Sequence, residues 1–214
     1  MTDEHAWNLY RWNVELASAT MPLVADLEVA LRNTMHDRLN SHFGRSDWWA
    51  SDKLLLDRDT HENVARTVEL HQKKIASGKV SAGRVVSELM FGTWVMLLTR
   101  GGNSAIGQAV DYEARLWRPI LRKGFATTRG TRPRRPSREE AHSRAALVQR
   151  LRNRCAHHEP IFNGVKKPGT ATMIPLLEVW EQAVQLLDWV CPDLGDMHRS
   201  QALLPNTIAA KPTS

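Results

Sequence analysis

The stretch PLVADLEVALRNTMHDRLNSHF, residues 22–43, decides the fold class. Its apolar side chains return at every fourth position, at Leu23, Leu27, Leu31, Met35 and Leu39. This spacing places them on one face of an α-helix, because the apolar residues of a half-buried strand return at every second position. Pro22 suits the first turn of this helix, and Gly44 suits its end.

Helical patterns recur along most of the remaining chain. We predict further helices at residues 5–19, 64–78, 81–98, 109–121, 137–158 and 173–190. The helix at 137 starts with a capping box of Ser137 and Glu140, and Pro160 disfavours helical geometry at the residue before it, so this helix should end near His158. No run alternates as a strand does. The sequence therefore predicts an all-α fold, a bundle of six or seven helices.

The length of 214 residues favours one domain. We expect a single helical domain over residues 1–191 and a loosely ordered tail over 192–214. Residues 127–138, TTRGTRPRRPSR, contain a glycine, two prolines and no apolar side chain, and so predict a loop.

Three features of the sequence bear on the compartment of the protein. The N-terminus lacks the basic start and apolar run of a signal peptide, and the longest apolar run, residues 89–98, is half the roughly 20 residues of a membrane helix. Cys155 and Cys191 form no CxxC pair. These features predict a cytoplasmic protein without a membrane partner.

Positive charge is concentrated in one segment. Between Arg115 and Arg154 stand thirteen Arg or Lys residues against two acids, whereas the rest of the chain has sixteen basic and twenty-one acidic residues. Such asymmetry indicates a polyanionic partner, RNA or DNA first and an acidic membrane surface second. A solvated basic face that keeps the protein soluble is the alternative.

The basic segment ends in RNRCAHHEP, residues 152–160. On a helix, residues four apart share a face, so Asn153 aligns with His157, whereas Arg152 and His157 differ by about 140°. Arg152 and His157 can converge only if the helix unwinds before His157 or if a second copy faces the first across a two-fold axis.

These residue types suit metal-free cleavage of RNA. A histidine can take the proton of a 2′-hydroxyl or protonate the leaving 5′-oxygen, and an arginine can hold the phosphate and stabilise its transition-state charge. Asn153 could hydrogen-bond a ring nitrogen of His157. The alternative is structural, with Arg152 and His157 satisfying the last carbonyls of the helix.

Other chemistries fit the spacing less well. Consecutive helical residues point about 100° apart, which disfavours a metal site at His157, His158 and Glu159, and we expect no cofactor. A thiol nucleophile at Cys155 with His158 lacks an orienting third group. Arg66 with His71 repeats the Arg-to-His spacing, but His71 falls in an apolar stripe, so we interpret this pair as chance.

The string LRNRCAHHEPIF, residues 151–162, resembles the signature of the bacterial Abi-like proteins, linked to abortive phage infection and placed in the HEPN superfamily. LEVALRN at 27–33, the pair Trp48 and Trp49, VVSELMFGTWVML at 85–97 and LWRPIL at 116–121 are similar to further family motifs and follow the expected order. The resemblance implies a dimerising helical bundle with a metal-independent endoribonuclease site where two copies of the motif meet.

By position, the resemblance implies Arg152, Asn153 and His157 as catalytic residues. His158 and Arg154 are supporting residues, and Glu28, Arg32 and Asn33 would pack beneath the motif, although Glu28 and Arg32 also form a plain i, i+4 ion-pair spacing. The basic loop departs from the family pattern, and we predict RNA contacts there from Arg129, Arg132, Arg134, Arg135 and Arg138.

The function predicted is therefore an RNA endonuclease in phage defence or a toxin, acting as a homodimer with RNA as partner. An antitoxin or regulatory partner would fit this role. The alternative is a catalytically inactive RNA-binding or dimerisation module; a protein-interaction role without nucleic acid leaves the basic segment unexplained.

Overall fold

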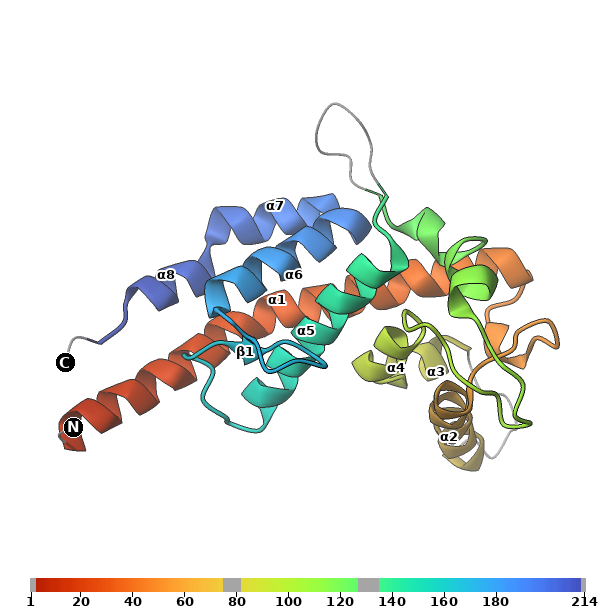
Figure 1. Ribbon diagram of the computed structural model, residues 1–214, viewed down its shortest axis with the longest axis horizontal. Coiled ribbons are helices and arrows are strands. Elements are labelled where there is room, and N and C mark those ends of the chain that lie inside the picture. The colour runs from red at the N-terminus through yellow and green to blue at the C-terminus, as the bar shows by residue number, and fades with distance from the viewer. Residues whose placement is uncertain (1–2, 75–81, 127–134, 213–214) are drawn as a thin grey trace. The chain divides into compact units, whose positions relative to one another are not determined.

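The computed structural model describes residues 3–74, 82–126 and 135–212. They form eight α-helices and one two-stranded sheet, so the predicted all-α class is confirmed (Figure 1). The described chain divides into two compact units. Unit 1 contains the described residues of 1–30 and 143–214, and unit 2 those of 31–126 and 133–142.

Helix α1 (Asp3–Phe43) is one continuous helix with Pro22 inside it (Figure 1). The prediction of two helices, 5–19 and 22–43, is therefore wrong. An internal proline costs about 3 kcal/mol because it removes one helical hydrogen bond and crowds the preceding turn. The buried stripe continues on both sides of it, through Trp12 and Leu16 before and Leu23 and Leu27 after, and this burial offsets the cost.

Unit 2 continues with the 3-10 turn η1 (Trp48–Ala50), α2 (Arg58–Lys74), α3 (Ala82–Glu88) and α4 (Phe91–Met96). The helix predicted at 81–98 is broken, because Met90 adopts extended backbone with φ −60° and ψ 151°. Its side chain is exposed while Leu89 and Phe91 beside it are buried, so the break lets both neighbours enter the core. Trp48 and Trp94 pack edge to face in that core, with ring centroids 6.0 Å apart.

The prediction of a helix at residues 109–121 is mostly wrong. The structure has one π-helical turn, η2 (Glu113–Trp117), and one 3-10 turn, η3 (Leu121–Gly124), on either side of the predicted break at Pro119. The Asp111 carboxylate accepts hydrogen bonds from the backbone N–H groups of Glu113 and Ala114, at 2.9 and 3.3 Å, and so starts the turn later than predicted.

Helix α5 (Arg138–Ala156) begins at the predicted capping box. The Ser137 hydroxyl accepts from the Glu140 N–H at 3.1 Å, and the Ser137 N–H donates to the Glu140 carboxylate at 2.8 Å. These reciprocal bonds satisfy two donors at the helix start.

Unit 1 ends in elements that the sequence predicts less well. Strands β1 (Val165–Lys166) and β2 (Met173–Ile174) form a small antiparallel hairpin that the sequence does not predict. Helix α6 (Leu176–Val190) ends where predicted, but Pro192 opens α7 (Pro192–Gln201), which is followed by α8 (Leu203–Ala209). Helices α7 and α8 thus lie in the segment for which the sequence predicts a loosely ordered tail.

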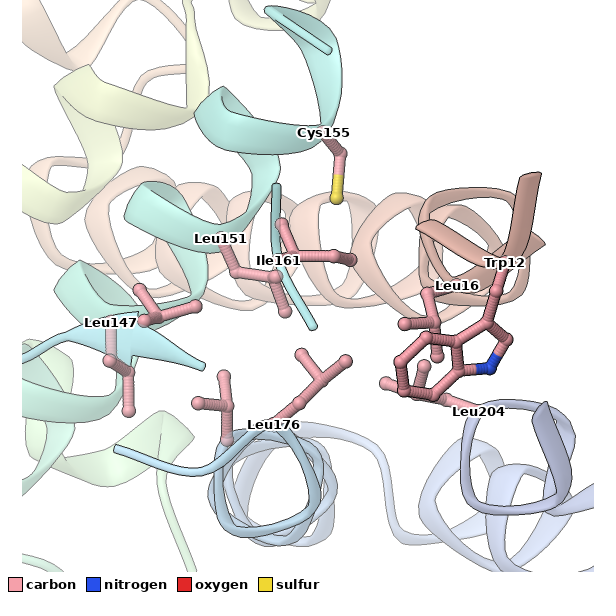
Figure 2. Packing of buried hydrophobic residues seen from close by; sticks show 10 residues of the cluster. Trp12, Leu16, Leu147, Leu151, Cys155, Ile161, Leu176 and Leu204 are labelled. Carbon is pink, nitrogen blue, oxygen red and sulfur yellow. The ribbon is translucent and has the colours of Figure 1, made fainter. Parts of the chain in front are cut away.

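The core of unit 1 joins α1, α5, β1, α6 and α8. Figure 2 shows Trp12 and Leu16 of α1 facing Leu176 and Leu204. The Trp12 indole N–H also donates to the backbone oxygen of Thr207 at 2.8 Å. Burial of Leu204 and this bond hold α8, because an isolated helix of seven residues is unstable in water.

Candidate functional site

The motif of Arg152, Asn153 and His157 lies at the C-terminal end of α5, where the predicted helix end is confirmed. The Glu159 N–H donates to the Arg154 carbonyl at 2.9 Å, and the His158 N–H donates to the Cys155 carbonyl at 3.2 Å. His158 adopts a left-handed backbone with φ 56°. This pattern is a Schellman cap, in which glycine is the usual residue at the His158 position.

Helical hydrogen bonding continues as far as His157, whose N–H donates to the Asn153 carbonyl at 2.9 Å. The helix therefore does not unwind before His157. At 100° per residue, Arg152 and His157 leave α5 about 140° apart, and both are exposed. One chain does not bring these two side chains together.

Asn153 and His157 share a face of α5, as predicted, and both are exposed. The hydrogen bond between them is the backbone one, and among the described residues no hydrogen bond joins the Asn153 side chain to the His157 ring. The expected contact between amide and imidazole is therefore not formed in the single chain.

Arg154 holds the loop that follows the helix. Its guanidinium pairs with the Glu159 carboxylate at 3.1 Å and donates to the carbonyls of Gly164, at 2.8 Å, and Pro160. Gly164 has φ +88°, and a Cβ there would lie 2.2 Å from the Ile174 carbonyl oxygen, so glycine is required where the loop meets β2. Arg154 is thus a structural support for the helix end.

Asn13 of α1 is a site residue that sequence reasoning missed. It is 8% exposed, its side-chain oxygen accepts from the Ile161 N–H at 2.7 Å, and its amide donates to the Glu159 carbonyl at 3.4 Å. Asn13 therefore ties the loop after α5 to α1. The sequence shows Asn13 only as a polar residue next to Trp12 of an apolar stripe. This pattern is too common in helices to identify Asn13 as a site residue.

A cavity of about 310 Å³ lies between α1 and the end of α5 in unit 1. It is lined mainly by apolar side chains of α1 together with Cys155, Ala156 and His158. Tyr10, Val14 and Met21 of this lining are exposed, and the Trp7 ring, also exposed, stacks on Tyr10 at 5.5 Å. An apolar surface thus borders the motif.

Glu28, Arg32 and Asn33 are separated by the boundary between the two units, since Glu28 belongs to unit 1 and the other two to unit 2. Arg32 donates to the Asn33 side-chain oxygen at 3.4 Å and to the Ser87 carbonyl at 3.5 Å. Among the described contacts Arg32 forms no ion pair with Glu28, contrary to the spacing. Packing of these residues beneath the motif stays a prediction.

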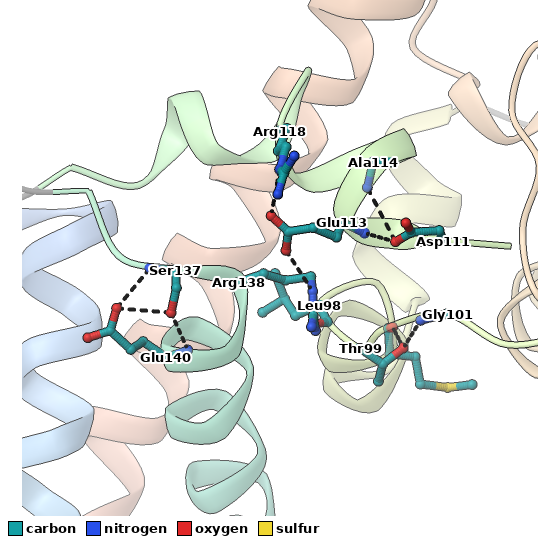
Figure 3. A network of polar contacts seen from close by, with 11 residues as sticks. Leu98, Thr99, Gly101, Asp111, Glu113, Ala114, Arg118, Ser137, Arg138 and Glu140 are labelled. Carbon is teal, nitrogen blue, oxygen red and sulfur yellow. Dashed lines mark hydrogen bonds and ion pairs between the residues drawn. The ribbon is translucent and has the colours of Figure 1, made fainter.

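The predicted RNA contacts divide into three groups. Arg129, Arg132 and Arg134 lie outside the described residues. Arg135 is exposed. The Arg138 side chain is 11% exposed, pairs with Glu113 at 3.1 Å and donates to the Leu98 carbonyl at 2.8 Å (Figure 3). Arg138 is therefore committed to contacts within unit 2, which argues against the phosphate contact predicted for it.

Burial raises the pKa of the Cys155 thiol to about 11, which opposes nucleophilic chemistry there. His71, which has the same spacing from Arg66 as His157 from Arg152, is buried, as predicted, with its Nε2 2.7 Å from the Glu88 carboxylate.

Within the described ranges, no three His, Cys, Asp or Glu side chains gather where they could hold a metal ion. None of the described helices has the length and apolar content needed to span a membrane.

Comparison with known proteins finds a match to a protein-family model. The family model described as Abi-like protein matches residues 1–163, a range that contains α1 with Asn13, all of α5, and the loop as far as Ile161. Neither the curated proteins nor the solved structures contain a match to this chain. Because the family model covers most of the 214 residues, the chain belongs to the Abi-like protein family.

Proposed function

We propose that this protein is a metal-independent endoribonuclease of abortive infection, with a HEPN-type site made by two copies of the chain. The observation that carries the proposal is the end of α5, where helical bonding persists through His157 while Arg152 and His157 are both exposed and leave the helix on different faces. A two-fold axis near this helix end would place Arg152 of one copy beside His157 of the other. Membership of the Abi-like family supports the phage-defence context.

The proposed chemistry uses the 2′-hydroxyl of RNA. The 2′-oxygen loses its proton and attacks the phosphorus, the bond to the 5′-oxygen breaks, and that oxygen gains a proton, leaving a 2′,3′-cyclic phosphate. His157 transfers the proton, a role worth about 10²–10⁴ in rate, and Arg152 binds the phosphate oxygens and stabilises their extra charge. Asn153, on the face of His157, orients the ring or the substrate.

The apolar surface of α1 supports dimerisation at this place. Trp7, Tyr10, Val14 and Met21 are exposed on α1, and the cavity behind them reaches Ala156 and His158. We assign a second copy of this chain as its occupant, because the Arg152 and His157 pair is incomplete without one. Exposed apolar surface of this kind marks interaction sites. An antitoxin or other regulatory partner stays a prediction.

The first test incubates purified protein with single-stranded RNA in EDTA, beside Arg152→Ala and His157→Ala variants with unchanged circular dichroism and sedimentation. Wild type is expected to cut and leave cyclic-phosphate ends, and each variant is expected to lose the activity. Equal cutting by the variants contradicts the site. Binding by wild type without cutting overturns the nuclease and favours the RNA-binding module.

The second test asks whether the site is shared between copies. Co-expression of Arg152→Ala and His157→Ala chains with different tags yields a mixed dimer that retains one Arg152 and one His157 on opposite chains. A two-fold composite site predicts recovery of about half the wild-type activity per mixed dimer, since one of its two sites is intact. A site within one chain predicts no recovery, and that result would refute the dimeric arrangement.

A further inference from the structure

A cleft of about 600 Å³ opens in unit 2, between η2, η3 and the start of α5. Three arginines line it, Arg118 of the segment after η2, Arg122 of η3, and Arg135 before α5. The buried side chains of Trp117 and Pro136 contribute to its wall. The cleft is separate in the sequence from the motif at the end of α5.

The two carboxylates that line the cleft already have partners. Glu113 pairs with Arg118 and with Arg138, at 3.1 Å in each case. Glu140 accepts from the N–H and the hydroxyl of Ser137, at 2.8 and 3.0 Å, in the capping box of α5 (Figure 3). Both acids are thus engaged with groups of unit 2.

Arg122 and Arg135 are the other two cationic side chains of the cleft lining, besides Arg118. Both are exposed, and among the described residues neither forms an ion pair with a carboxylate. A guanidinium carries its charge at every physiological pH and presents donors in a fork that matches two oxygens of a phosphate. Two such groups on one cleft, held by different segments, provide donors for a single phosphate or for successive phosphates of a strand.

We propose that this cleft binds backbone phosphates of RNA through Arg122 and Arg135, with Arg118 kept in place by Glu113. The choice of RNA rests on the proposed function, and the strong positive charge of the segment from Arg115 to Arg154 favours a polyanion of this kind. The cleft then supplies binding that does not depend on base sequence, while the helix end of α5 supplies the chemistry.

The test measures binding of a labelled single-stranded RNA to full-length His157→Ala protein in EDTA, so that cleavage does not enter the reading. Arg122→Gln combined with Arg135→Gln is compared with the parent across a salt series. If each arginine neutralises one phosphate, the slope of log affinity against log salt should fall by about 1.4, and affinity at 0.1 M salt should fall about 25-fold.

The matched control is Lys53→Gln combined with Arg66→Gln, which removes the same charge from exposed positions of unit 2 outside the cleft. It should change affinity by less than about threefold, because solvent-exposed charges away from the bound strand are screened by salt. Equal losses in the two double variants would overturn the cleft as a specific site.

The two proposals fail in different ways. If the wild type never cuts RNA but the cleft variant binds RNA weakly, the nuclease proposal fails and the cleft proposal stands. If the wild type cuts RNA but the cleft variant binds RNA normally across the salt series, the cleft proposal fails and the nuclease proposal stands. Binding of inorganic phosphate that does not compete with RNA also contradicts the assignment of RNA to the cleft.

Discussion

The backbone N–H of Ile161 donates a 2.7 Å hydrogen bond to the side-chain oxygen of Asn13, a residue 148 positions earlier in the chain. This bond connects the first helix to the loop that follows the Arg152–His157 motif. It is buried, and its loss leaves the Ile161 N–H without an acceptor. The position of the helix end therefore depends on α1 as well as on α5.

Asn13→Ala should lower the free energy of unfolding by about 1–3 kcal/mol, the cost of an unsatisfied buried donor. Urea unfolding followed by circular dichroism measures this change. Asn8→Ala, at an exposed position of the same helix, should stay within about 0.5 kcal/mol of wild type. Equal stability of the two variants would show that the Asn13 bond contributes nothing.

Arg152 and Arg154 should respond differently to the same substitution. Arg154→Gln removes contacts to Glu159, Gly164 and Pro160, and should cost about 1.5–3 kcal/mol of unfolding free energy. Arg152→Gln, at an exposed position, should change stability by less than about 0.5 kcal/mol but abolish RNA cleavage. Unfolding and cleavage are measured for both variants. A destabilised Arg152→Gln that still cleaves RNA, beside a stable Arg154→Gln that does not, would exchange the two roles.

His158→Gly should stabilise the protein by about 1 kcal/mol, because φ 56° carries a penalty for a side chain with a Cβ and none for glycine. If the His158 ring takes no part in the chemistry, this variant also keeps RNA cleavage within a few-fold of wild type. His158→Ala serves as control, since alanine retains the Cβ. Loss of cleavage in both variants, with the fold intact, would make His158 catalytic.

Charge on the apolar surface of α1 should separate the proposed dimer. Tyr10→Glu combined with Met21→Glu places two like charges in an interface between copies, and should shift the protein to monomers and remove cleavage. Sedimentation velocity measures the oligomeric state. Val29→Glu, at another exposed apolar residue of α1 outside the cavity lining, should leave both properties unchanged. An unaltered dimer in the double variant would place the interface elsewhere.

Cys155 should react slowly with iodoacetamide. A pKa of about 11 leaves about one thiolate in a thousand at pH 8, and the side chain is buried. Mass spectrometry of the folded protein should show alkylation of Cys191, which is partly exposed, well before Cys155. In guanidinium chloride the two should react alike. Rapid alkylation of Cys155 in the folded protein would reopen its role as a nucleophile.

Predictions that depend on neighbouring residues agree well with the structure. The capping box of Ser137 and Glu140 spans three positions, and the end of α5 follows from Pro160 acting on the residue before it. Pro22 shows the limit of this reasoning. A local rule predicts a helix start there, but burial of the apolar stripe on both sides keeps α1 continuous.

The sequence by itself determined the helical class, the start and end of α5, and the divergence of Arg152 from His157, because each depends on spacings within one or two helical turns. Only the tertiary structure decided which partners Asn13, Arg154 and Arg138 contact and that α7 and α8 form helices. These outcomes depend on contacts such as Asn13 with Ile161 and Trp12 with Thr207. Residues so far apart in the chain meet only when the core is buried, and no local pattern records their pairing.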